Sequence, residues 1–267
     1  MVRSRRGAAL AAQARSGPLP YLLGVSLLVY TVLVFAPVGG QVAAICGQLN
    51  LSALWVLLTA VPWKWWLWPL AVDWSLMIVA MMTPLVSVQV ARLIWSSRPG
   101  RAPFAVGTFF AAYWMTWCAA AVVLIPLAIA ITAVLGSGLA LWLLGVAALA
   151  YSASPLAGHA RNLCHRSDPI PAFGPGIVIE SARAGFRMGG ACCLACWPWM
   201  LIPLAVQTGH FLVMVCVGLY LFAERIAAPA PSAWRVPPGL ETILGPSRIS
   251  ARLRTSTPAD MFGRPKI

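Results

Sequence analysis

The stretch Met188–Met200 reads MGGACCLACWPWM and lies where a polar segment gives way to an apolar run. Residues four apart in a helix lie one above the other on the same face. The stripe of sulfur atoms that results holds Met188, Cys192, Cys196 and Met200. Thiolates and thioethers are soft ligands that favour copper as Cu(I), with zinc as a weaker candidate. The alternative interpretation is that these side chains only pack, as small or adaptable apolar groups.

The composition on either side of this stretch indicates a helical membrane protein. Hydrophobic residues make up 60% and charged residues only 9% of the 267 residues, whereas a soluble domain carries about 25% charged residues. Repeated apolar runs of about 20 residues predict an all-α, polytopic transmembrane bundle in a lipid bilayer. Three His and six Asp plus Glu are few for an active site. Because no phosphate-binding, zinc-protease or hydrolase motif is present, we expect no enzyme.

The hydropathy pattern predicts about six spans. Their bounds, in chain order, are 21–38, 67–94, 104–131, 139–153, 188–206 and 209–223. Pro84 is expected to kink the second span, and Gly136 and Gly138 mark a turn between the third and fourth. The segment 41–62 is interpreted as re-entrant or interfacial, with a seventh spanning helix as the alternative.

The charged residues predict the topology and the domain boundaries. A basic N-terminus at 1–20 precedes the transmembrane domain at 21–225, which contains a cytoplasmic polar loop at 155–187. The tail at 226–267 is rich in Pro, Ser and Arg and is predicted to be disordered and cytoplasmic. With six spans, every Lys and Arg except Lys64 lies on the same side as both termini. This asymmetry predicts cytoplasmic termini in a bacterial inner membrane, and it explains the net charge of +13 without nucleic acid.

Sulfur also recurs in the second span. If the second and fifth spans pack together, sulfur atoms from both converge at a similar depth, given the rise of about 1.5 Å per residue. The first-choice metal ligands are Cys192, Cys196, Met81 and Met200, and the second-choice ligands are Cys193, Met77 and Met82.

The polar loop offers one further candidate ligand, Cys164, which is followed by His165. A lone Cys-His pair is a weak metal signal, because a complete zinc site shows four ligands at recognisable spacing. The alternative is a loop that merely carries these residues. Glu224 and Arg225 are interpreted as an anchor at the inner membrane surface, with Arg225 extending to the interface.

Three blocks of sequence resemble an uncharacterised bacterial family of predicted metal-binding integral membrane proteins. The blocks, in the family's order, are DWSLMIVAMMTP at Asp73–Pro84, YSASPLAGHARNLCHRSDP at Tyr151–Pro169 and GGACCLACWPWM at Gly189–Met200. The positions similar to the family pattern are Trp74, Met77, Met81, Met82, Pro84, Tyr151, Pro155, Leu156, Cys164, Gly189, Cys192, Cys196, Trp197 and Met200. The resemblance implies metal binding and names no reaction.

These observations together predict a membrane protein that binds a soft metal, copper above others, for metal handling or for assembly of a metalloenzyme. Its expected partners are the bilayer and a copper-dependent enzyme or a metallochaperone. One alternative is a transporter or permease for a metal or small solute. The other is a metal-free structural or accessory subunit whose sulfur atoms pack the bundle.

Overall fold

The computed structural model of the chain describes residues 17–35, 63–97, 100–166, 176–206, 209–227 and 229–243. These residues form helices and no strand, as the all-α prediction requires. The helices are α2 (Leu19–Phe35), α5 (Trp63–Met82), the 3₁₀ helix η1 (Thr83–Val86), α6 (Ser87–Ser96), α7 (Ala102–Ala153), α8 (Pro155–His165), α9 (Gly176–Ala205), α10 (His210–Ile226) and α11 (Pro238–Ile243). The basic N-terminus up to residue 16, the segment 41–62 and the tail from 244 onward lie outside the described residues.

Three helical stretches in the described ranges are long and apolar enough to cross a membrane. They are Leu67–Ser96, which runs from α5 through η1 to α6, then α7 and α9. The helix α2 is also apolar but shorter, at 17 residues. Predicted spans and observed helices therefore coincide along most of the described chain.

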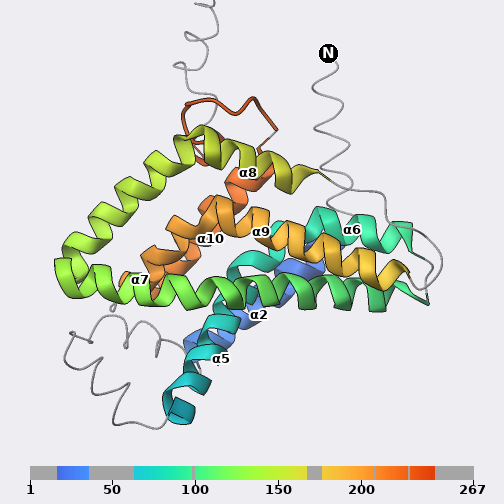
Figure 1. Cartoon of the computed structure of the whole chain (residues 1–267), viewed down its shortest axis with the longest axis horizontal. Helices are drawn as coiled ribbons and strands as arrows, with labels where there is room; N and C mark the ends of the chain where they lie inside the picture. The colour runs from blue at the N-terminus through green and yellow to red at the C-terminus, as the bar shows by residue number, and fades with distance from the viewer. Residues whose placement is uncertain are drawn as a thin grey trace, which may run out of the picture.

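Proline and glycine break the long helices where the sequence predicts it. The 3₁₀ helix η1 places Pro84 in its first turn and separates α5 from α6, because proline lacks the N–H that a continuous helix would use. Gly136, at φ 73°, interrupts α7, and this left-handed conformation is accessible to glycine without steric cost. Figure 1 shows the two arms of α7 meeting at a sharp corner, with α9 and α10 between them.

The segment at 155–187 differs from the predicted loop, because its described part is helical. Ser154 caps α8 by accepting a hydrogen bond from the backbone N–H of Ala157, 3.3 Å away. Helix α9 begins at Gly176, twelve residues before the predicted span. After an apolar first turn, Glu180 and Arg183 follow one turn from each other, and their side chains lie 2.6 Å apart.

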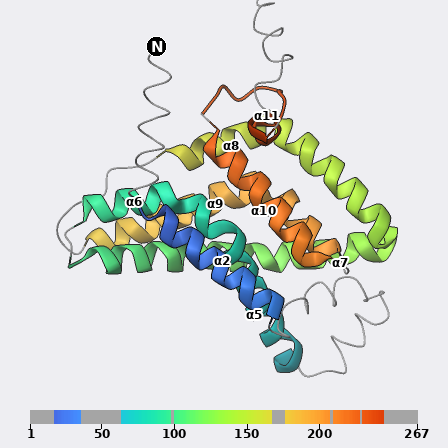
Figure 2. The same ribbon diagram turned by 180° about the vertical axis from the view of Figure 1, so that it is seen from behind.

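The described part of the tail, residues 229–243, also contains regular structure. The helix α11 packs against α10, and its Gly239 lies so close to Tyr220 and Glu224 that a Cβ atom there would come within 2.8 Å of both. Asn162 of α8 donates a hydrogen bond to the carbonyl oxygen of Ala230 at 2.8 Å. Residues 229–243 show no hydrophobic periodicity, so these tertiary contacts with α8 and α10 hold the segment in place. Figure 2 shows α11 at the upper end of α10.

The central packing is between α7 and α9, and two glycines allow it. Gly185 of α9 faces the backbone of Phe109 and the Cβ of Ala112, and Gly189 faces Thr116. Small residues four apart on one helix let a second helix approach closely. Helix α9 packs mainly on α7, α8 and α10, and α10 also contacts α5. The main contacts of α9 are therefore not with the second span, as the hypothesis of converging sulfur atoms assumed.

Candidate metal centre

Three cysteines line one small cavity, which we call the cysteine cavity. Cys164 comes from α8, and Cys192 and Cys196 come from consecutive turns of α9. All three are buried and free of disulfides. The volume of about 20 Å³ leaves room for a single water-sized guest.

The Sγ atoms of Cys192 and Cys196 lie 4.0 Å apart. Two sulfur ligands bound to one metal at about 2.3 Å each, with a 120° angle between the bonds, stand about 4 Å apart. This pair is therefore spaced to share one ion. Within the described ranges no three His, Cys, Asp or Glu side chains are gathered closely enough to hold a metal, so Cys164 has to move toward the pair to become a third ligand.

Tyr113 of α7 donates a hydrogen bond to Cys192. Its hydroxyl lies 3.2 Å from the Sγ of Cys192, and its ring stacks on Phe109 at a centroid distance of 6.2 Å. Both aromatic side chains are buried. The close packing of α7 on α9 thus places a hydrogen-bond donor on one candidate ligand.

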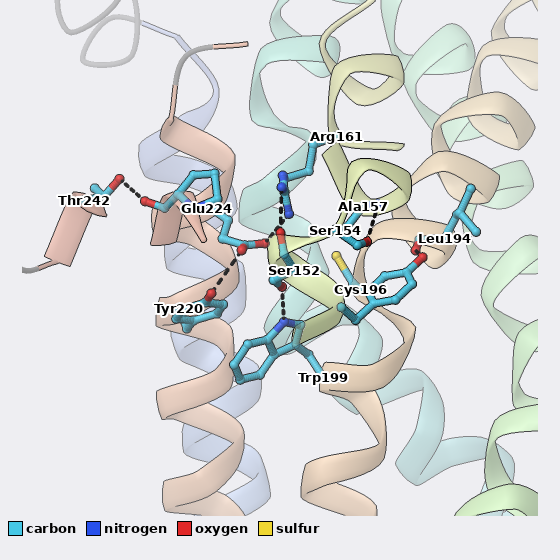
Figure 3. Close-up of polar contacts among 12 residues, drawn as sticks. Ser152, Ser154, Ala157, Arg161, Leu194, Cys196, Trp199, Tyr220, Glu224 and Thr242 are labelled. Atoms are coloured by element: carbon cyan, nitrogen blue, oxygen red, sulfur yellow. Dashed lines mark hydrogen bonds and ion pairs between the residues drawn. The ribbon is translucent and has the colours of Figure 1, made fainter. Parts of the chain in front are cut away.

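An ion pair forms part of the same cavity wall. Nη1 of Arg161 lies 3.5 Å from Oε2 of Glu224, and Nη2 of Arg161 donates to the carbonyl oxygen of Ser152 at 2.9 Å. Both charged side chains are buried. Figure 3 shows Arg161 pointing at Glu224 and Ser152. Among the described residues the Nε atom of Arg161 has no hydrogen-bond partner.

Aromatic side chains complete this polar network below the ion pair. The hydroxyl of Tyr220 donates to Oε1 of Glu224 at 3.0 Å, and Nε1 of Trp199 donates to Oγ of Ser152 at 2.8 Å. The ring centroids of Trp199 and Tyr220 lie 4.1 Å apart, and both side chains are visible in Figure 3. These two hydrogen bonds pair the buried carboxylate of Glu224 and the buried hydroxyl of Ser152.

Arg225 turns into the protein instead of extending to the membrane surface as predicted. Its Nη2 donates to the carbonyl oxygen of Cys164 at 2.8 Å and lies 3.5 Å from Sδ of Met188. Its Nε donates to the carbonyl oxygen of Leu85 at 3.1 Å. Backbone acceptors from α8 and η1 explain the inward direction, because each charge-assisted hydrogen bond is stronger than a neutral one.

The environment determines the protonation of the two polar residues at the end of α8. Burial raises the pKa of the Cys164 thiol to about 11, against the opposing effect of the Arg225 guanidinium. Burial, assisted by Arg225 and Arg92, lowers the pKa of His165 to about 4. At neutral pH Cys164 is therefore a thiol, and His165 is a neutral imidazole. A metal that binds Cys164 displaces its proton.

The other predicted ligands do not line the cysteine cavity. Met77, Met81, Met82 and Met200 are all buried, and Met81 lies against Gly218 of α10. Cys193 is half-buried on the neighbouring face of α9. Their role as ligands stays a prediction.

Sequence reasoning missed Tyr113 and Arg161. The hydrogen bond between Tyr113 and Cys192 joins residues 79 positions apart, and the ion pair joins α8 to α10. No local spacing signals such contacts. A buried Arg in a segment expected to be an exposed loop is recognisable only once α8 has docked on the bundle.

Comparison with known proteins gives a match to a protein family. The family model described as PpoB2, copper chaperone, matches residues 71–245. This range contains all three cysteines of the cavity. No curated protein and no solved structure matches the chain.

Proposed function

The chain belongs to the PpoB2 copper chaperone family, and from this premise we propose that it binds Cu(I) through Cys164, Cys192 and Cys196 and delivers it to a copper-dependent enzyme. The observation that carries the proposal is the single cavity that cysteines from two helices line together. Copper is the cargo in this proposal, and the protein itself performs no catalysis.

The donor set and its charges suit Cu(I). Thiolates are soft ligands that select Cu(I), and the 4.0 Å spacing of Cys192 and Cys196 fits two ligands of one ion. Cu(I) bound by two or three thiolates carries a net charge of −1 or −2. Arg161, Arg225 and Glu224 line the same cavity, and Glu224 already pairs with Arg161. The remaining positive charge of Arg225 offsets part of the negative charge of the buried copper site.

The proposed location is a bacterial inner membrane, which the chain crosses six times with both termini in the cytoplasm. The six spans are α2, the α5–α6 stretch, the two arms of α7, α9 and α10. The outer face of α7 supports contact with lipid, because it exposes large apolar side chains: Val122, Val123, Val134, Trp142 and Val146. Reporter fusions after residues 100, 136 and 227 test this topology, and the proposal requires only the first and third reporters to be cytoplasmic.

Metal analysis of the purified protein tests the copper site. We expect about one copper per chain when the protein is expressed with copper and purified under reductant. The double variant Cys192→Ser, Cys196→Ser is expected to lose it. The matched control is Cys216→Ser, which replaces an exposed cysteine of α10. Full copper content in the double variant at full expression would overturn the proposed ligands.

A second measurement separates delivery from its rivals. A chaperone is expected to activate a purified apo-enzyme that needs copper and to leave copper outside sealed proteoliposomes. Copper uptake into the vesicles would identify a transporter instead. Absence of metal from every sample would favour the accessory-subunit alternative.

A further inference from the structure

A second and much larger cavity adjoins the cysteine cavity. It has a volume of about 730 Å³ and lies between α6, α7, the end of α8 and α9. This volume falls within the range of about 300–1,000 Å³ that is typical of small-molecule sites. We call it the arginine cavity, because Arg92, Arg166 and Arg187 belong to its lining.

The three arginines approach the arginine cavity from different parts of the fold. Arg92 belongs to α6, Arg166 follows the last residue of α8, and Arg187 belongs to α9. No Asp or Glu occurs among the described lining residues. Guanidinium groups bind carboxylates through paired hydrogen bonds. The cavity therefore favours a ligand that carries more than one anionic group.

Gln89 fixes the backbone that carries one of these arginines. Its side-chain amide donates to the carbonyl oxygen of Arg166 at 3.0 Å and to that of Cys164 at 3.3 Å. Gln89 itself lines the arginine cavity. The amide of Gln89 thus links Arg166 of the arginine cavity to Cys164 of the cysteine cavity.

A thioether stands between the two cavities. Met188 lines the arginine cavity, and its Sδ lies 3.5 Å from Nη2 of Arg225. Arg225 in turn lines the cysteine cavity. A soft thioether ligand therefore occupies the boundary that copper would cross on its way from one cavity to the other.

We propose that the arginine cavity receives Cu(I) as an anionic complex with a small, carboxylate-bearing thiolate, which passes the ion to the cysteines by way of Met188. This inference rests on the proposed function and names the form in which copper arrives. The arginines bind the carboxylates of the carrier and orient its copper toward Met188.

The transfer is a ligand exchange without redox change. The bond between Cu(I) and the carrier sulfur breaks as a bond to Sδ of Met188 forms, and copper then moves to the cysteines. Each protein thiol that binds copper releases one proton. Each departing carrier thiolate takes up one of these protons, and any remaining proton passes to water. Copper stays in the +1 state throughout, so no oxidant or reductant is consumed.

Binding of a copper-free carrier analogue tests the cavity independently of the metal site. S-methylglutathione retains the carboxylates but has no thiolate, and its affinity is measured by calorimetry with the full chain in a neutral detergent. The double variant Arg92→Gln, Arg166→Gln is expected to bind at least tenfold more weakly. The control Arg183→Gln, which removes an exposed arginine of α9 paired with Glu180, is expected to bind within twofold of the parent protein. Equal binding by all three proteins, or by none, would overturn the proposal.

The loading rate separates this proposal from the proposed function. Loading from Cu(I)–glutathione is expected to slow at least tenfold in the arginine double variant, whereas loading from the cationic Cu(I)–acetonitrile complex is expected to be unchanged. Met188→Leu should slow loading from Cu(I)–glutathione without changing the affinity for S-methylglutathione. If the parent protein takes copper from the cationic donor and the variants load normally from glutathione, the proposal fails and the copper site stands. If no donor loads copper, the proposed function itself fails.

Anionic lipid is the other source of ligand chemistry that arginines recognise. The binding measurement is therefore repeated in nanodiscs with and without phosphatidylglycerol. Unchanged affinity for S-methylglutathione supports a carrier site. Loss of binding in the anionic nanodiscs would assign the arginines to lipid headgroups and overturn the proposal.

Discussion

Replacing Gly185 by Ala tests the packing that places the candidate ligands. A Cβ atom at this position would overlap the carbonyl oxygen of Phe109 and lie 2.9 Å from the Cβ of Ala112. Ordinary contacts of a Cβ atom begin at 3.4 Å. Because one obstacle is backbone, α7 and α9 must separate by about 0.5 Å or more, and overpacking of this kind costs about 1–3 kcal/mol.

Gly190→Ala is the matched control, because a Cβ atom there meets nothing within 4 Å. In both variants alanine gains the same helix propensity, about 1 kcal/mol relative to glycine. The difference between the two variants therefore isolates the clash. We expect Gly185→Ala to be less stable than Gly190→Ala by about 1–3 kcal/mol.

Reversible unfolding in mixed micelles, titrated with a denaturing detergent, measures the two free energies of unfolding. The same samples are titrated with Cu(I) against a competing chelator. We expect Gly185→Ala to bind copper more weakly than Gly190→Ala, since separation of α7 from α9 moves Tyr113 away from Cys192. Equal stability of the two variants, within about 0.5 kcal/mol, would refute the inferred contact between the helices, because the clash should cost at least twice that.

Three further substitutions test the polar contacts around the cysteine cavity. Tyr113→Phe removes the hydroxyl that contacts Cys192. A hydrogen bond contributes a net of about 0.5–1.5 kcal/mol, so the Cu(I) affinity in competition titrations should be about 2- to 10-fold weaker. An unchanged affinity would exclude the contact. Glu224→Gln leaves Arg161 buried without its ion pair, so the free energy of unfolding should fall by about 3–5 kcal/mol, and a variant as stable as the parent would contradict this. Trp199→Phe leaves the hydroxyl of Ser152 without the indole donor and should lower the free energy of unfolding by about 1–3 kcal/mol. The control is Trp142→Phe, which replaces an exposed tryptophan. An equal loss in both variants would show that the hydrogen bond is not made.

The sequence predicted the breaks in the helices because proline and glycine act locally. Pro84 interrupts the stretch between α5 and α6, and Gly136 interrupts α7, as expected. The extent of the helices was less predictable. The stretch from Glu180 to Arg187 in α9 contains three charged residues, so hydropathy placed the beginning of the span at Met188 instead of Gly176.

Residue spacing predicted which candidate ligands lie together only where they belong to one helix. Cys192 and Cys196 are four residues apart, and helical geometry alone places them on the same face. Cys164 was named as a candidate ligand, but no spacing joined it to these two cysteines, because they lie on another helix. The contact of Met188 with Arg225, and that of Met81 with Gly218, depend on α10 lying beside α9 and α5.

The amino-acid sequence by itself determined that the chain is helical and apolar and that a sulfur stripe runs along Met188–Met200, because composition and spacing are local properties. Only the tertiary structure decided which sulfur atoms share a cavity and which charges stand beside them. It did so through the close approach of α7 to α9 at Gly185 and Gly189 and through the docking of α8. A contact between residues distant in the chain depends on how helices pack, and no spacing within one helix specifies that packing.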